Sequence, residues 1–447
     1  MAPAPSEVPL LRRLLHSTTA VWVAFVLVHG WLALVGLVLI PQQAFWDLDL
    51  YRYWMWLGIY RDQWPVISGT WVYPIGAIVP MLVAAVGGTG GVSGYAPAWS
   101  AMITLLDGIA LAVLLRVRRP DRPDDAPTTY GAWWWLAFLA LLGPVAMGRL
   151  DAVVAPVVVI ALAIALRHPR ITSALLTAAA WIKVAPGALL IALFFAVKRP
   201  LRSVVVPAAI VSVVVVGVTA ALGGFAHVAS FLTEQDQRGL QIEAPGATPW
   251  LVAGLWVPSI TRVLNQAIVS WEIHGPGTQG VADVLGALFF LAIGASALLL
   301  WWRREQLGAR MWSGGIARTE LLVRGAMLLT LAMLVFNKVG SPQYMGWLAP
   351  PVAVALALRL PGWRTTAWLV AGIAGATQLV FPWLYSQVIY GGAGVTFTLA
   401  ARNVALVVLL VHTVVALVRP VPPEEAAQAQ VEERRRQERI TSASPAA

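Results

Sequence analysis

The stretch STTAVWVAFVLVHGWLALVGLVLI, residues 17–40, contains no Asp, Glu, Lys or Arg. As an α-helix it would be about 36 Å long at about 1.5 Å per residue, enough to cross the hydrocarbon core of a bilayer, which is about 30 Å thick. It is too long for the core of a signal peptide, and no small-residue cleavage site follows it. The stretch therefore predicts a retained first membrane span.

Apolar stretches of similar length follow along almost the whole chain. Hydrophobic residues make up 59% of the 447 residues and charged residues 12%, about half the charged share of soluble domains. The 22 tryptophans exceed what a soluble core requires, and tryptophan favours the membrane–water interface. The sequence thus predicts an all-α polytopic membrane protein. We expect about 12 transmembrane helices, near residues 17–40, 72–87, 97–116, 132–148, 150–166, 172–197, 203–222, 281–302, 320–337, 342–358, 364–385 and 394–418.

The orientation follows from basic clusters at the two ends of the chain. An even number of spans places both termini on one side, and Arg12, Arg13 and the arginines of 434–436 predict that this side is the cytoplasm. We expect residues 1–16 and a charged, disordered tail, 419–447, to be cytoplasmic, with the membrane domain at 17–418.

Two features leave the topology of residues 72–200 open. Lys183 and Pro186 interrupt the run 172–197, which is either one span or two half-helices. Under strict alternation, the basic loops 116–122 and 167–170 fall on the outer side, against the positive-inside rule.

The composition also excludes several kinds of site. The chain has no cysteine, which excludes disulfides and cysteine-ligated metals, and its six histidines show no zinc-binding spacing. The glycine-rich stretch GGTGG, 87–91, lacks the Lys-Ser/Thr of a nucleotide-binding loop. The net charge of +10 lies in loops between apolar runs, so we expect contacts with membrane lipids and none with nucleic acid. We expect no cofactor and no metal; whether activity depends on a metal stays open.

Two loops should lie outside the cytoplasm, at residues 41–71 and 223–280. The first should contain an amphipathic helix lying in the membrane interface, because the large apolar and aromatic residues of 50–60 lie among charged residues: Asp47, Asp49, Arg52, Arg61 and Asp62. The second is rich in Gly and Pro and carries several acidic residues; loops of this length are usually functional or partly disordered.

The first loop begins with two carboxylates, Asp47 and Asp49, beside aromatic residues. Partial desolvation and like charge raise the pKa of one carboxyl in such a pair, which suits a general base acting on a hydroxyl. A structural interpretation is also open: Asp47 could cap the helix and Asp49 could pair with Arg52.

Charged residues also interrupt later apolar runs. Lys338, within NKVGSPQY (337–344), could hold a lipid phosphate or simply reach the interface as an anchor. Lys183 precedes a proline that would kink the helix, and we expect it to face a polar cavity. Arg149 and Asp151 are either a self-neutralising pair or cavity residues. We expect Asp107 to be protonated or paired, and Arg402 to be an interface anchor.

Several of these segments, in this order, resemble the polyprenol-phosphate-mannose-dependent enzymes of glycosyltransferase family 87, which have the GT-C architecture. DLDLY (47–51) is similar to the family's D-L-x-V-Y, and WVYP (71–74) to its aromatic–Tyr–Pro element. GRLD (148–151) resembles G-Q-x-N/D with Arg in place of Gln. IKVAP (182–186) resembles the K-P-x-P region, and NKVGSPQY (337–344) resembles N-K-V-x-S-P-Q-Y, seen in one branch.

The resemblance implies transfer of a sugar, usually mannose, from a polyprenyl phosphate donor to a hydroxyl of a lipid or glycan acceptor on the outer face. It implies that Asp47 is the general base. Members that extend phosphatidylinositol mannosides carry His after the S-P element, where this chain has QYMGW (343–347), which implies a different branch. We expect acceptor or sugar contacts from Asp49, Tyr51, Tyr73, Gln343 and Tyr344, and donor-phosphate contacts from Lys338, Lys183 and Arg149.

A transporter or lipid flippase is the alternative class, with Asp107 and Lys183 as gates. Such a protein usually concentrates polar residues near mid-bilayer and often contains an internal repeat. This sequence shows no repeat, and its polar residues are predicted near one surface. A third interpretation, a non-catalytic scaffold, would leave the loop carboxylates tolerant of substitution.

Overall fold

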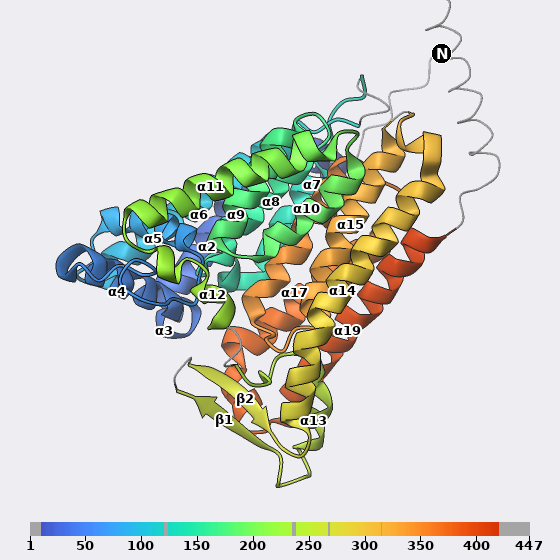
Figure 1. The fold of residues 1–447 in the computed structure, drawn as a ribbon. Coiled ribbons are helices and arrows are strands. Elements are labelled where there is room, and N and C mark those ends of the chain that lie inside the picture. The colour runs from blue at the N-terminus through green and yellow to red at the C-terminus, as the bar shows by residue number, and fades with distance from the viewer. Residues whose placement is uncertain (1–9, 120–123, 235–237, 267–268, 314, 420–447) are drawn as a thin grey trace, which may run out of the picture.

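The computed structural model of the protein describes residues 10–119, 124–234, 238–266, 269–313 and 315–419 (Figure 1). The predictions for the tail after Arg419 and for residues 1–9 lie outside the described residues. The elements are α1 Leu10–His16, α2 Thr18–Leu34, α3 Pro41–Ala44, α4 Trp46–Arg61, α5 Ile78–Ala84, α6 Val92–Leu114, α7 Tyr130–Leu142, α8 Asp151–Ile164, α9 Pro169–Ile182, α10 Ala185–Ala196, α11 Val206–Ala221, α12 Ser230–Thr233, α13 Thr248–Ala253, β1 Thr261–Asn265, β2 Ser270–His274, α14 Thr278–Leu307, α15 Ile316–Val335, α16 Ala349–Ala357, α17 Arg364–Gln378, α18 Tyr385–Ile389 and α19 Ala393–Val418.

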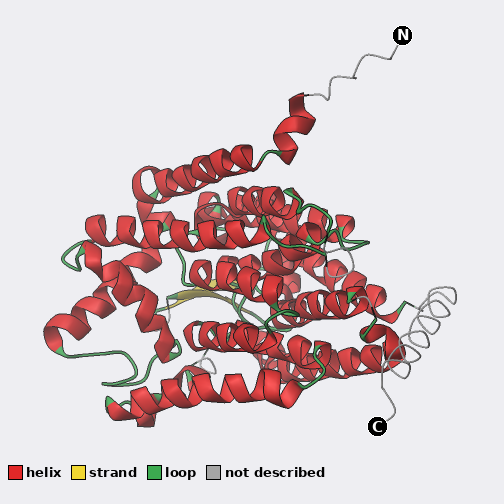
Figure 2. Cartoon of the chain, turned by 90° about the horizontal axis from the view of Figure 1, so that it is seen from above, coloured by secondary structure: helices red, strands yellow, loops and turns green. Residues whose placement is uncertain are grey.

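The predicted all-α polytopic membrane fold is confirmed. In both views the long helices lie side by side along a common direction (Figures 1 and 2). Within the described residues, six helices are long and apolar enough to cross a membrane: Thr18–Leu39, Val92–Leu114, Leu201–Ala221, Thr278–Met311, Arg364–Trp383 and Ala393–Val418. Shorter apolar helices lie at Ile75–Gly87, Tyr130–Ala146, Asp151–Ile164 and Ala185–Ala196.

The helices differ in how much protein surrounds them. Nearly every residue of α15 from Leu321 to Val335 is buried, and α8 and α16 are buried on most sides. By contrast, α11 and α14 expose large apolar side chains such as Val213 and Phe290, both at least 70% exposed. In a bilayer these exposed apolar faces contact lipid tails. Their side chains are then not exposed to water, so leaving them outside the protein core carries no hydrophobic penalty. Helices α11 and α14 therefore face lipid, while α8, α15 and α16 lie at the buried centre of the bundle.

The interrupted run 172–197 forms two helices. Helix α9 ends at Ile182, Lys183 has extended backbone angles (φ −150°, ψ 123°), and α10 begins at Ala185. Pro186 lies in the first turn of α10, where its missing N–H has no helical partner to lose. The break therefore places the lysine in a turn between two packed helices.

The predicted span 72–87 behaves differently from the others. It contains only the short helix α5 flanked by 3₁₀ turns, Ile75–Ala77 and Ala85–Gly87. At its start, the Tyr73 ring lies 6.4 Å from the ring of Tyr51 in α4. Just after its end, the Thr89 carbonyl accepts a hydrogen bond of 2.6 Å from Arg52, also in α4. Both ends of this segment thus lie against α4.

One end of the bundle gathers the basic loops. Thr129 and Trp133 donate to the Leu15 carbonyl, and Arg303 donates to the Arg419 carbonyl over 2.9 Å. The side chains of Lys198 and Arg304 both lie over the Trp312 ring. The loops after α6, α10 and α14 therefore lie at the same end of the bundle as the two ends of the described chain.

The opposite end carries the two predicted loops. The first contains α4, whose Leu48, Tyr51, Met55 and Gly58 are buried against the protein. The second contains α12, α13 and an antiparallel hairpin in which Thr261 of β1 pairs with His274 of β2. Figure 1 shows the hairpin and α13 at one end of α14 and α19. The strands were not predicted.

Candidate functional site

Asp47 forms an ion pair with an arginine far along the chain. Its Oδ1 lies 2.7 Å from Nη1 of Arg149, whose side chain is 6% exposed against 24% for Asp47. Asp47 lies in the first turn of α4, and Arg149 lies in the turn that precedes α8. A Cβ at Gly148 would overlap the ring of Phe45. Glycine at 148 therefore permits the close approach that brings Asp47 and Arg149 together.

A second ion pair lies beside the first. Lys183 Nζ is 3.5 Å from Oδ2 of Asp151, the first residue of α8. The same ammonium lies 4.9 Å from the ring centroid of Tyr73 and 5.1 Å from that of Tyr344. Trp347 Nε1 donates to Oδ1 of Asp151 over 2.8 Å. The α9–α10 break thus directs its lysine to a carboxylate between aromatic faces, an arrangement that favours the ammonium form.

Tyr51 contacts Asp47 and the turn that carries Arg149. Its hydroxyl donates to Asp47 Oδ2 over 3.5 Å and accepts from the Leu150 amide over 3.3 Å. Burial first, and then the nearby Tyr73 and Asp47, raise the pKa of Tyr51 well above its ordinary value. The phenol therefore stays protonated and remains a hydrogen-bond donor to the Asp47 carboxylate.

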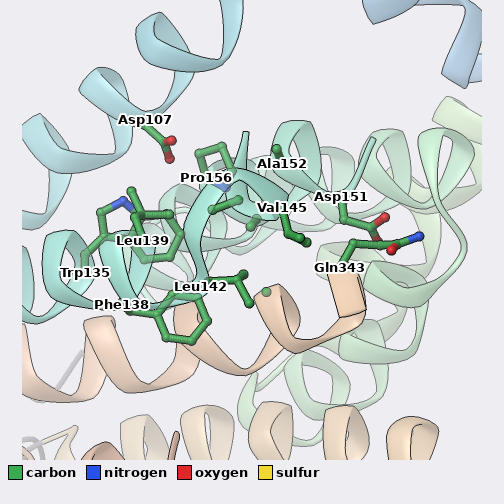
Figure 3. Close-up of a pocket in the computed structure, with 13 residues that line it drawn as sticks. Asp107, Trp135, Phe138, Leu139, Leu142, Val145, Asp151, Ala152, Pro156 and Gln343 are labelled. Atoms are coloured by element: carbon green, nitrogen blue, oxygen red, sulfur yellow. The ribbon is translucent and has the colours of Figure 1, made fainter. Parts of the chain in front are cut away.

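A narrow pocket leads from this cluster into the bundle. Asp151 and Gln343 line it at one end, and Asp107 and Trp135 line it at the other (Figure 3). Between them its walls are apolar side chains of α7 and α8. Gln343 therefore lies near Asp151 of the second ion pair.

Residues 71–324 of the chain match glycosyltransferase family 87. The chain belongs to glycosyltransferase family 87. No curated protein matches it. The matched region includes Tyr73, Arg149, Asp151 and Lys183, while Asp47 and the segment 337–344 lie outside it. The family resemblance predicted from the sequence is thus confirmed, and the protein is a membrane-embedded glycosyltransferase.

The residues predicted for the site fall into three groups. Asp49 is directed outward on α4, with a side chain 57% exposed, and pairs with Arg52 at 2.7 Å, as in the structural interpretation. Lys338 follows α15, and its carbonyl accepts from the Gln241 amide over 3.0 Å. The residues that the contacts above bring together are Asp47, Tyr51, Tyr73, Arg149, Lys183, Gln343 and Tyr344.

The structure excludes two of the alternatives left open for Asp47 and Arg149. Arg149 does not pair with Asp151, because Asp151 starts α8 and its carboxylate turns toward Lys183. Asp47 does not cap α4; the helix begins one residue earlier, at Trp46, and Phe45 occupies the capping position. Arg149 and Asp151 are neighbours in the sequence, but each forms an ion pair with a residue of a distant segment.

The two isolated charges inside predicted spans have different outcomes. Asp107 is paired, as expected: its Oδ2 lies 3.0 Å from His29 Nε2 in α2, with both side chains at most 3% exposed. The expectation that Arg402 is an interface anchor is wrong. It is 2% exposed and donates to the Glu243 carbonyl over 2.5 Å and to Asn403. The second loop folds back onto α19 and buries it.

That buried network contains residues to which the sequence analysis assigned no role. Glu243 Oε2 accepts from Gln241 over 3.2 Å and from the Tyr385 hydroxyl over 3.4 Å. The Gly340 amide donates to Gln241 over 2.7 Å. The acidic residues of the long loop were a visible signal, but nothing in the sequence indicated which of them would be buried. Among the described residues, no group of three or more His, Asp or Glu could hold a metal ion.

Proposed function

We propose that this family 87 protein transfers a sugar, mannose, from a polyprenyl phosphate donor to a hydroxyl of a lipid or glycan acceptor on the outer membrane face. One observation carries the proposal: Asp47 lies in a cluster with Arg149 and Lys183, two cations suited to a lipid phosphate. The cluster lies at the end of the bundle opposite the basic loops.

In the proposed step, Asp47 accepts the proton of the acceptor hydroxyl. The acceptor oxygen attacks the anomeric carbon as the bond from that carbon to the phosphate oxygen breaks, and the configuration inverts. The polyprenyl phosphate leaves with the electron pair, and Arg149 and Lys183 offset its charge. A phosphate leaving group needs no acid to protonate it, so one carboxylate suffices, unlike glycoside hydrolysis with its two.

The arrangement of loops supports an outward-facing site. We propose that α2, α6, α7, α8, α9, α10, α11, α14, α15, α16, α17 and α19 cross the membrane, twelve in all, and that the segment 72–87 does not. With α9 and α10 crossing separately, the basic loops 116–119 and 167–170 join the other basic loops on one side. That side is cytoplasmic by the positive-inside rule, which resolves the conflict in the sequence.

The test uses two aspartates of the same helix. We expect Asp47→Asn, in purified protein reconstituted with labelled polyprenyl phosphomannose and candidate acceptors, to lower the turnover number at least about 100-fold, the range of general-base catalysis. Asp49→Asn is the matched control, because Asp49 is exposed and two residues away; we expect less than about a twofold change. Full transfer by Asp47→Asn would remove Asp47 as the base. Movement of intact donor across vesicles without transfer would favour a flippase.

A further inference from the structure

A second buried carboxyl lies near Arg149, apart from Asp47. Glu243 lies between α12 and α13 and is 2% exposed. One of its oxygens, Oε2, is hydrogen-bonded by Tyr385 and Gln241. The other, Oε1, is buried and has no hydrogen-bond partner among the described residues. Burying a carboxylate with one oxygen unsatisfied is costly, which calls for a reason beyond packing.

A continuous set of contacts leads from Glu243 to Arg149. The Tyr385 ring, whose hydroxyl binds Glu243, lies 5.3 Å from the Phe381 ring in an edge-to-face arrangement. The Arg149 guanidinium lies at the other end of this set of contacts, 5.4 Å from the Phe381 ring centroid. Arg149 is thus held between Asp47 on one side and the Phe381–Tyr385–Glu243 contacts on the other.

Burial and the groups around Glu243 together place its titration near neutral pH. Burial raises the pKa of Glu243 to about 7, while Arg402, the Tyr385 hydrogen bond and Arg149 act in the opposite direction. Arg402 contributes from α19, Tyr385 from α18 and Arg149 from the turn before α8. Glu243 therefore changes charge within electrostatic reach of Arg149 at ordinary working pH.

We propose that Glu243 is a positioning residue that controls how much positive potential Arg149 offers to the donor phosphate. The inference rests on the proposed function, in which Arg149 binds that phosphate. When Glu243 is protonated, the guanidinium is balanced by Asp47 alone and attracts the phosphate strongly. When Glu243 is ionised, its negative charge competes for Arg149 and weakens donor binding.

The test measures donor affinity, which requires no knowledge of the acceptor. The protein in lipid nanodiscs is titrated with a polyprenyl phosphomannose on both sides of pH 7. The phosphodiester of this donor keeps one negative charge over that range. We expect the wild-type Kd to rise about tenfold as the pH increases through about 7, the change that corresponds to one pKa unit of coupling. In Glu243→Gln we expect tight binding and no such rise.

Glu272→Gln is the matched control. Glu272 is a buried carboxyl of the same loop, 6% exposed, and it binds the Gly239 amide and Asn265. We expect this variant to keep the wild-type pH dependence. In Tyr385→Phe, which keeps the ring and removes the hydroxyl, we expect the rise in Kd to move to higher pH, because the lost hydrogen bond had favoured the ionised Glu243.

Three outcomes would overturn the inference alone. An unchanged rise in Glu243→Gln would exclude Glu243 as its source, and an equal loss in Glu272→Gln would show a general effect of the loop. If the rise in Kd stays at the wild-type pH in Tyr385→Phe, the Tyr385 hydroxyl does not influence the titration of Glu243 as proposed. If wild-type protein binds no donor at any pH while it remains folded, the proposed function itself fails and the inference with it.

Discussion

At the scale of single residues, both cations of the candidate site already have a carboxylate partner. Arg149 is paired with Asp47 and Lys183 with Asp151, each largely out of water. A buried pair contributes little net stability by itself, but removing one member leaves an uncompensated charge. The two pairs therefore keep four charged groups in place without substrate, at modest cost.

Lys183 provides the clearest prediction at this scale. We expect Lys183→Ala to raise the KM for a polyprenyl phosphomannose at least about tenfold, about 1.4 kcal/mol, because the phosphate loses a desolvated cation. Steady-state kinetics against donor concentration would measure it. The control is Lys198→Ala, which removes a lysine that also lies over an aromatic ring but at the basic end. Equal effects of the two substitutions would contradict a phosphate-binding role.

A second residue-scale prediction concerns the protonation of Glu243 and stability. The pKa of Glu243 is raised in the folded protein to about 7 from an ordinary value of about 4.5. The folded state therefore favours the protonated form, so this contribution is present at low pH and is lost as the pH rises between those values. We expect thermal stability in detergent to fall with pH over this interval, and Glu243→Gln to remove that slope. A wild-type slope retained in Glu243→Gln would assign it to another group.

At the scale of elements, hydrogen bonds hold the segments 239–244 and 337–344 together. The Gln241 amide donates to the Lys338 carbonyl, and the Gly340 amide donates to the Gln241 side chain. A Cβ at Gly340 would fall against backbone atoms of Glu243 and Ala244. Glycine in the element N-K-V-G-S-P-Q-Y thus has a physical reason: a second loop passes across it.

Gly340→Ala tests this packing. We expect it to lower the free energy of unfolding by about 1–3 kcal/mol or more, because backbone atoms must move to admit the methyl group. Gly346→Ala is the matched control in the same segment, since the nearest atom to its added Cβ would be 3.8 Å away. Thermal unfolding in nanodiscs would compare them. Equal melting temperatures for both variants and wild type would show that the two loops separate readily.

The sequence predicted local properties well and long-range partners poorly. Charge and proline within an apolar run correctly indicated the break at Lys183, and the family motifs named most residues of the cluster. The sequence did not indicate the pairs Asp47–Arg149 and Lys183–Asp151. Arg149 and Asp151 are close in the chain and suggested a pair with each other, but side chains two residues apart point in different directions. The burial of Arg402 depends on Glu243, 159 residues away, which no local pattern records.

At the scale of the whole molecule, the two ends of the bundle have different chemistry. Basic loops and both ends of the described chain gather at one end, and the candidate site, α4 and the hairpin lie at the other. Under the proposed topology the loop between α8 and α9 is cytoplasmic. Strict alternation of the sequence-predicted spans would place it outside.

Site-directed labelling can distinguish these topologies, because the chain has no cysteine of its own. His168 is exposed in the loop between α8 and α9, and Thr70 is exposed in the first loop. We expect His168→Cys in intact cells to resist a membrane-impermeant maleimide until the membrane is opened, and Thr70→Cys to react at once. Immediate labelling of His168→Cys would overturn the proposed topology.

The pairing of Asp47 with Arg149 also has a kinetic consequence. In the proposed reaction the same guanidinium that pairs with Asp47 also binds the donor phosphate, so an acceptor hydroxyl that arrives alone finds the carboxylate engaged by Arg149. Once the donor phosphodiester draws Arg149 toward itself, the Asp47 carboxylate is released to contact the acceptor hydroxyl. Turnover would then follow a compulsory order, donor before acceptor, and water entering an empty chamber would meet no activated base.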